Sequence, residues 1–125
     1  MKVRFQADDD FNEHIVAGLR RKEPAVDVRS AAEARLRGLS HQEVLALAAR
    51  DGRVLVSHDF RTMPAEFARF LASGMERGTG YGVVSPGVFI VPQSMAMSAA
   101  IEMLLMIWAA SDAAEWYERV VRLPL

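Results

Sequence analysis

The stretch VRFQADDD, residues 3–10, alternates apolar and polar side chains and ends in three consecutive carboxylates. Such alternation predicts a β-strand, and apolar residues recur at helical spacing from Phe11 onward. The three acids are therefore expected at a strand-to-helix turn. In open α/β sheets this turn is where ligand sites form.

A second stretch, RVLVSHDF at residues 53–60, repeats this plan. The carboxyl end of its short apolar strand carries Ser57, His58 and Asp59. If the two strands are parallel neighbours, their carboxyl ends meet at one edge of the sheet. Asp8 and Asp59 are then expected to converge on one site.

The rest of the chain alternates strand and helix patterns. Further strands are expected at residues 25–28, 87–91 and 120–123. Helices are expected at residues 11–22, from a capping box at Ser40 to Gly52, from Pro64 to a stop at Gly74, at residues 95–110, and after a cap at Asp112. Residues 29–39 are expected to be mostly loop with at most a helical turn, and residues 78–87 (GTGYGVVSPG) are expected to be loop. This order predicts one domain over residues 1–125, an α/β three-layer sandwich with a mostly parallel central sheet of four or five strands.

The size, charge and cysteine content of the chain limit the classes of function that it can have. The 125 residues are 51% hydrophobic, which suffices for the core of one domain. Fifteen basic and sixteen acidic side chains give a net charge of -1, so overall charge neither indicates nor excludes a nucleic-acid partner. The chain has no cysteine, which excludes disulfides and thiolate chemistry and fits a reducing cytoplasm.

No targeting or membrane segment is expected. The N-terminal residues lack the pattern of a signal peptide. The apolar run at residues 95–110 is shorter than the roughly 20 residues of a membrane span and contains Glu102. We interpret it as a buried helix whose broad apolar surface also predicts a homodimer.

Carboxylates at two strand ends are the donors that a hard divalent cation prefers. Asp8 and Asp59 are therefore the main candidates to hold Mg²⁺ or Mn²⁺. Such ions activate water and stabilise the leaving oxygen in phosphodiester hydrolysis. Glu43 is a third candidate, although the capping box with Ser40 explains this residue without any chemistry.

Several neighbouring residues have two interpretations. Asp10 forms a capping-box pattern with Glu13 and is expected to cap the first helix rather than to bind metal. Asp9 is expected to be a solvated turn residue or an outer acid. Ser57 either orients a metal-bound water or hydrogen-bonds the turn. The other polar candidates are His41 and His58, as ligands, proton carriers or ordinary polar surface, and Arg61 with other arginines, as contacts to a phosphate backbone.

The segments QADDDF, SHQEVLALAARDGRVLVSHD, MPAEFARFL and SPGVFIVPQ, with the RLPL end, resemble short bacterial PIN-like domains. The resemblance covers almost the whole chain and is most specific in its middle block. It implies a three-layer fold, an acidic pocket holding Mg²⁺ or Mn²⁺, and hydrolysis of RNA as the toxin of a toxin-antitoxin pair. It places Asp8 as the first metal-binding acid and Asp59 as the acid after the third strand, with Ser57 beside it.

The chain departs from the PIN-like pattern at two positions. Relatives commonly carry an acid at the start of the helix where this chain has His41, with Glu43 two residues on. Asp10 stands where relatives often have asparagine. Glu43 or His41 could substitute for the missing acid, or the pocket could be incomplete. A catalytically decayed module that binds protein or RNA is therefore the alternative hypothesis.

Phosphoryl transfer is a second enzyme class to consider. Asp8 and Asp10 form the Asp-x-Asp of haloacid-dehalogenase phosphatases, and receiver domains also begin with paired acids. Both families usually need a lysine late in the chain, whereas the lysines here are Lys2 and Lys22. This class is disfavoured on that ground, because a short motif alone is weak support.

Overall fold

Five parallel strands form the centre of the protein in a computed structural model that describes residues 1–76 and 84–125. The sheet order is β2-β1-β3-β4-β5. The strands are β1 (Phe5–Ala7), β2 (Val28–Arg29), β3 (Val54–Ser57), β4 (Val88–Ile90) and β5 (Val120–Arg122). Every neighbouring pair is parallel, so the predicted α/β class is confirmed, with a sheet of five strands.

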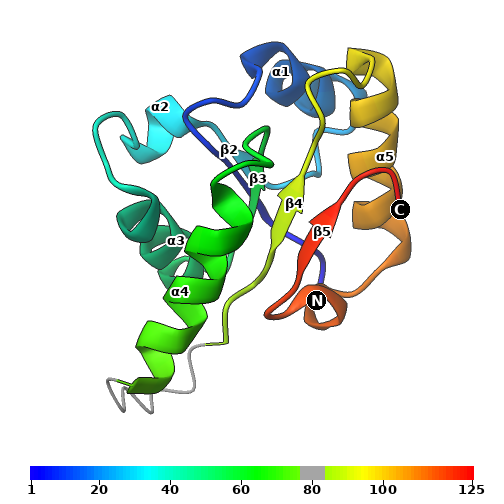
Figure 1. Cartoon of the computed structure of the whole chain (residues 1–125). Coiled ribbons are helices and arrows are strands. Elements are labelled where there is room, and N and C mark those ends of the chain that lie inside the picture. Colours follow the sequence, from blue (N-terminus) through cyan, green and yellow to red (C-terminus); the bar gives the residue numbers. More distant parts are fainter. Residues whose placement is uncertain (77–83) are drawn as a thin grey trace.

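Helices cover both faces of this sheet, which makes the three layers (Figure 1). On one face α1 (Glu13–Lys22) packs against α5 (Met97–Ala110). On the other face α3 (His41–Arg50) packs against α4 (Met63–Glu76). The short elements α2 (Ala31–Ala34) and η1 (Ala113–Trp116) complete the order. Among the described residues, no helix has the length and apolar character needed to cross a membrane.

Alternation along the strands divides the core into two clusters. Phe5 and Phe89 face α1 and α5, where the Phe89 ring meets Trp116 edge-on with centroids 5.0 Å apart. Leu55 and Val88 face the opposite way, toward α3 and α4. All four residues on these strands are at most 1% exposed. Burying a large apolar side chain contributes about 1.5–3 kcal/mol relative to exposure, so both clusters stabilise the sheet.

Residues 29–39 are mostly loop with one helical turn, α2, as expected, and its start has a capping box between Ser30 and Glu33. Several boundaries elsewhere differ from the prediction. Strand β2 begins only at Val28. Helix α4 begins one residue before Pro64 and continues past Gly74 to Glu76, so the predicted stop at Gly74 is wrong. A helical glycine costs about 1 kcal/mol, which tertiary packing can offset. The segment GTGYG lies outside the described residues.

The outer face of α5 leaves apolar side chains in contact with solvent. Met97 is 42% and Met106 is 49% exposed, while Ile101 and Leu104 on the inner face are buried. The predicted homodimer through this helix stays a prediction. Light scattering at micromolar concentration is expected to give twice the monomer mass, and Met106→Glu to restore the monomer. A monomeric wild-type protein would contradict it.

Gly87 fixes the approach of the chain to β4. Its φ is +105°, and an added Cβ would collide with the backbone carbonyl oxygen of Trp116. Gly38 also has a positive φ, +84°, but open space around its Cβ position. The left-handed conformation costs a non-glycine residue about 1–2 kcal/mol.

We therefore expect Gly38→Ala to lower the free energy of unfolding by about that amount. Gly87→Ala should lower it by clearly more, because backbone atoms must also move. Urea denaturation of both variants beside the wild type measures the difference. Equal losses of unfolding free energy in the two variants would show that the close approach of the Trp116 carbonyl to Gly87 adds nothing to the cost of Gly87→Ala.

Candidate functional site

The carboxyl ends of β1 and β3 bring the first acid into position. Ala7 lies opposite Val56 in the parallel register, and the backbone N–H of Asp8 donates to the Val56 carbonyl at 2.9 Å. The Asp8 side chain points into this junction and the residue is only 9% exposed. Its Oδ1 accepts from the backbone N–H of Asp9 at 2.8 Å. Asp9 itself is exposed, as expected for a turn residue.

Asp10 belongs to this junction and does not cap α1. Its Oδ1 accepts from the Ser57 hydroxyl at 3.3 Å and from the His58 backbone N–H at 3.4 Å. The cap of α1 is Asn12, whose side-chain oxygen accepts from the His14 backbone N–H at 2.9 Å. The predicted capping role of Asp10 is wrong, because a turn closed by Asp8 and Phe11 delays the start of the helix.

Ser57 links the turn after β3 to the turn after β1. It is fully buried at the end of β3. Its hydroxyl donates to the carboxylate of Asp10 at 3.3 Å and accepts from the Asp59 backbone N–H at 3.0 Å. Ser57 also acts to lower the pKa of the nearby Asp8. Ser57 thus orders both turns at this edge of the sheet.

The two carboxylate oxygens of Asp59 have different partners, one in the turn before α4 and the other at His41. Oδ1 accepts from the backbone N–H groups of Arg61 at 3.2 Å and Thr62 at 2.8 Å, just before α4. Oδ2 lies 3.6 Å from Nε2 of His41, the first residue of α3. The charge of His41 also acts on Asp8. His41 therefore stands at the acid cluster.

Burial raises the pKa of Asp8, and the nearby charge of Asp10 raises it further. Hydrogen bonds from the Asp9 backbone and from Ser57, together with the charge of His41, act in the opposite direction and only partly compensate. The carboxylate of Asp8 is buried and that of Asp10 is exposed, and the two like charges repel each other. A cation placed between them would remove that repulsion.

His58 is a buried structural residue, so its interpretation as ordinary polar surface is wrong. Nδ1 lies 2.7 Å from the Val91 carbonyl and must donate to it, while Nε2 accepts from the Asn12 backbone N–H at 3.2 Å. Phe11 stacks on the ring, with centroids 4.6 Å apart. Both ring nitrogens are engaged in holding α1 to the ends of β3 and β4.

Glu43 is held at the start of α3, away from this chemistry. Its Oε1 accepts from the Ser40 backbone N–H at 3.0 Å, and the Ser40 hydroxyl accepts from the Glu43 backbone N–H at 3.1 Å. The bond from the Ser40 backbone lowers the pKa of Glu43. The structure shows the capping box, and no contact joins Glu43 to Asp8 in the part of the chain that it describes.

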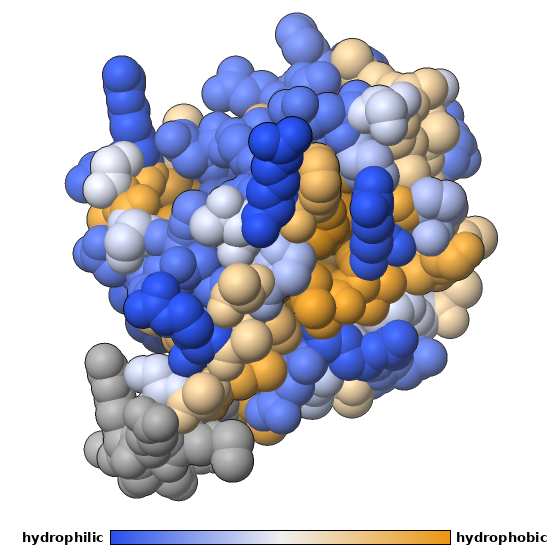
Figure 2. Space-filling model, in the orientation of Figure 1, coloured by the Kyte–Doolittle hydropathy of each residue, from blue (hydrophilic) through white to orange (hydrophobic). Residues whose placement is uncertain are grey.

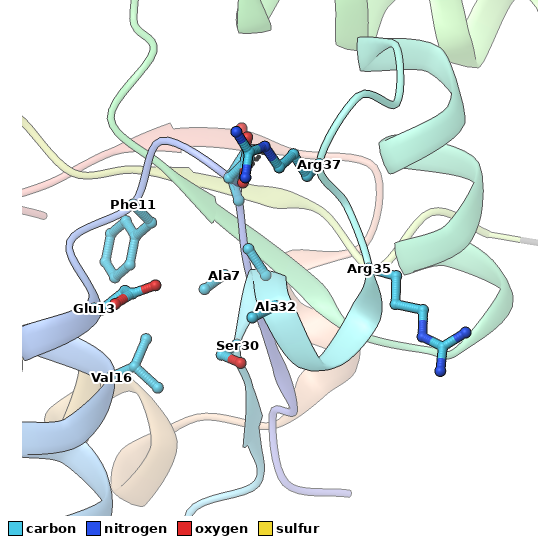
Figure 3. A pocket seen from close by; sticks show the side chains of 11 residues that line it. Ala7, Phe11, Glu13, Val16, Ser30, Ala32, Arg35 and Arg37 are labelled. Atoms are coloured by element: carbon cyan, nitrogen blue, oxygen red, sulfur yellow. Dashed lines mark hydrogen bonds between the residues drawn. The ribbon is translucent and has the colours of Figure 1, made fainter.

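A cavity of about 540 Å³ opens beside Asp8, between the start of α1 and the α2 turn. Figure 3 shows Phe11 and Glu13 on one side and Ala32 on the other, with Arg35 extending away. Arg37 also lines the cavity and forms no salt bridge with any described residue. It is thus an available cation next to the acids.

Several other basic side chains form ion pairs or hydrogen bonds elsewhere in the structure. Arg20 pairs with Glu33, and Arg29 pairs with Asp51 at 2.8 Å. Lys2 donates to the carbonyls at the end of α5, and Lys22 pairs with Glu102. No described lysine stands at the acid cluster, which weighs further against phosphoryl transfer of the phosphatase or receiver type.

No family model matches the chain, and no curated protein or solved structure is significantly similar to it. The PIN-like resemblance therefore stays a prediction, and the function must be argued from the site itself.

The donor set of the cluster fits a hydrated divalent cation. Mg²⁺ is usually held by one or two carboxylates and keeps several waters. Asp8 and Asp10 both supply hard carboxylate oxygens, and the repulsion between them favours a cation. In residues 1–76 and 84–125, no group of three or more acidic or histidine side chains is arranged to enclose a metal ion. The two carboxylates therefore fit a metal site whose remaining ligands are water molecules or substrate atoms.

The raised pKa of Asp8 has a consequence for stability. Its folded pKa exceeds the unfolded value of 3.8, so its ionised form destabilises the fold. The penalty is absent below the unfolded pKa and develops as the pH rises through the folded pKa. In EDTA at pH 7, Asp8→Asn should therefore raise the melting temperature, with a gain that shrinks toward pH 3.8.

Thermal unfolding followed by circular dichroism at several pH values measures this gain. Asp9→Asn, at the exposed neighbour, is the control and should have a smaller effect. A wild-type protein that is as stable as Asp8→Asn at pH 7 would contradict the repulsion described above.

Proposed function

We propose that the protein is a ribonuclease that hydrolyses phosphodiester bonds with the help of Mg²⁺ or Mn²⁺. The observation that carries this proposal is the buried carboxylate of Asp8 beside the exposed carboxylate of Asp10, which accepts from Ser57, at the carboxyl ends of β1 and β3. Paired carboxylates of this kind commonly hold the metal in phosphodiester hydrolysis. The PIN-like resemblance supports RNA as the substrate.

Each residue of the cluster has a part in this scheme. Asp8 and Asp10 would hold the cation, which when bound supplies an activated water and neutralises the phosphate. Ser57 holds the carboxylate of Asp10, and the Asp9 backbone N–H holds that of Asp8. His41, whose Nε2 lies 3.6 Å from the Asp59 carboxylate, would exchange a proton with the leaving oxygen. Arg37, at the neighbouring cavity, can bind a substrate phosphate.

The biological setting follows from the resemblance alone. We propose a cytoplasmic toxin whose activity a cognate antitoxin protein restrains. A second candidate function is a catalytically decayed module that binds protein or RNA. His41 at the position of a common acid and Glu43 held in its capping box favour this alternative.

Cleavage of labelled single-stranded RNA by the purified protein, with Mn²⁺ or Mg²⁺, tests the proposal. Asp8→Asn and Asp10→Asn are each expected to reduce the rate by more than about 100-fold, since even outer contacts of metal sites contribute about 10- to 100-fold. EDTA should abolish cleavage by the wild type. Asp112→Asn is the matched control, because Asp112 is exposed and caps η1, a role that asparagine also fills.

Retained activity in Asp8→Asn, or cleavage that EDTA does not affect, would rule out the metal role. Glu43→Gln separates the metal-binding role that the sequence predicts for Glu43 from its role in the capping box of α3. Glutamine keeps the capping box and loses the charge. A small effect is expected if Glu43 only caps α3. The absence of both cleavage and metal binding, the latter measured by calorimetry, would establish the decayed module.

A further inference from the structure

An exposed aromatic ring directly follows Asp59. Phe60 is 51% exposed, and two arginines lie against its ring. The guanidinium carbon of Arg61 is 5.6 Å from the ring centroid, and that of Arg122 is 5.3 Å from it. We call these three residues the aromatic platform. Because Arg122 ends β5, the platform joins the loop after β3 to the edge strand.

The platform lies at the same edge of the sheet as the acid cluster. All five strands are parallel, so their carboxyl ends share one edge. Strands β3 and β5 are two strand spacings apart, which is about 10 Å. The platform therefore begins one residue from Asp59 and extends away from the acids across β4 to β5.

The sheet face beneath the platform is open at β5. Arg122 lies opposite Ile90 in register, and Val120 lies opposite Val88, so both project toward the side of α3 and α4. The two residues on β4 are buried, whereas Val120 is 41% exposed. Figure 2 shows hydrophobic residues gathered over β4 and β5 and bordered by strongly hydrophilic side chains. A ligand can thus reach the ring of Phe60.

The charge of the platform is not compensated. Neither Arg61 nor Arg122 forms a salt bridge with another residue in the described part of the chain, unlike Arg20 and Arg29. An exposed ring between two free guanidinium groups suits a ligand with flat rings and negative charges. Unpaired bases with their phosphates have both properties.

We infer that the aromatic platform binds single-stranded RNA beside the acid cluster, with one base stacked on Phe60 or its arginines and the phosphates near the guanidinium groups. The choice of RNA rests on the proposed function. Bases in a duplex already stack on each other, so the platform should prefer single strands.

Fluorescence anisotropy of a labelled single-stranded oligoribonucleotide, measured in EDTA, tests the platform without turnover. Phe60→Leu should weaken binding by about fivefold to 150-fold, the range for one stacked base. Phe60→Trp should retain it. Arg122→Gln should weaken binding and reduce the slope of log affinity against log salt by about 0.7 for each phosphate that the variant no longer neutralises.

Arg21→Gln is the matched control, because Arg21 is exposed near the end of α1, toward the opposite edge of the sheet, and should bind as the wild type does. A duplex of the same sequence should bind more weakly to the wild type, and Phe60→Leu should reduce this preference. Circular dichroism confirms that each variant is folded.

The outcomes separate the platform from catalysis. Binding that depends on Phe60, in a protein that cleaves nothing, would support the platform and overturn the proposed nuclease. Cleavage with unchanged RNA affinity in both Phe60→Leu and Arg122→Gln would overturn the platform and leave the nuclease standing. A Phe60→Leu variant that changes the oligomeric mass but not RNA affinity would instead identify this face as an interface between copies, which also overturns the inference.

Discussion

The burial of one carboxylate, that of Asp8, is the constraint on which the arrangement at the sheet edge depends. A buried charge is costly unless hydrogen bonds or an opposite charge compensate it. Here the Asp9 backbone and Ser57 compensate in part, while Asp10 adds to the cost. The parallel pairing of β1 with β3 holds Asp8 at this edge of the sheet, where the residue is only 9% exposed and lines a cavity. A cation at this carboxylate would offset the cost of its burial.

Local signals predicted much of this architecture because they act within one element. Alternation predicted β1, a short apolar run predicted β3, and the capping box at Ser40 predicted the start of α3. The parallel pairing of these strands followed from the order of elements. The capping pair of Ser30 and Glu33 was equally visible, but the arginine-rich residues around it lack an apolar stripe that would have indicated a helix.

Features that depend on distant partners could not be predicted in the same way. Asp10 and Asn12 are both suitable caps for α1, and contacts of Asp10 with Ser57 decide between them. His58 has polar character in the sequence, yet Val91 and Asn12 bury it and use both of its nitrogens. The contact of Phe60 with Arg122 likewise joins segments that only the sheet order brings together.

The residues around the acids belong to elements that pack in two different hydrophobic clusters. Asp8 and Asp10 lead into α1, whose inner face packs in one cluster, while His41 begins α3 and Asp59 precedes α4, and these two helices pack in the other. Ser57 links the two sides, because its hydroxyl donates to Asp10 and accepts from the Asp59 backbone N–H. Substitutions at neighbouring residues have energies that do not simply add. For protein engineering, repacking beneath α3 and α4 is therefore an adjustment that also reaches the carboxylates, through Ser57 and the paired strands β1 and β3.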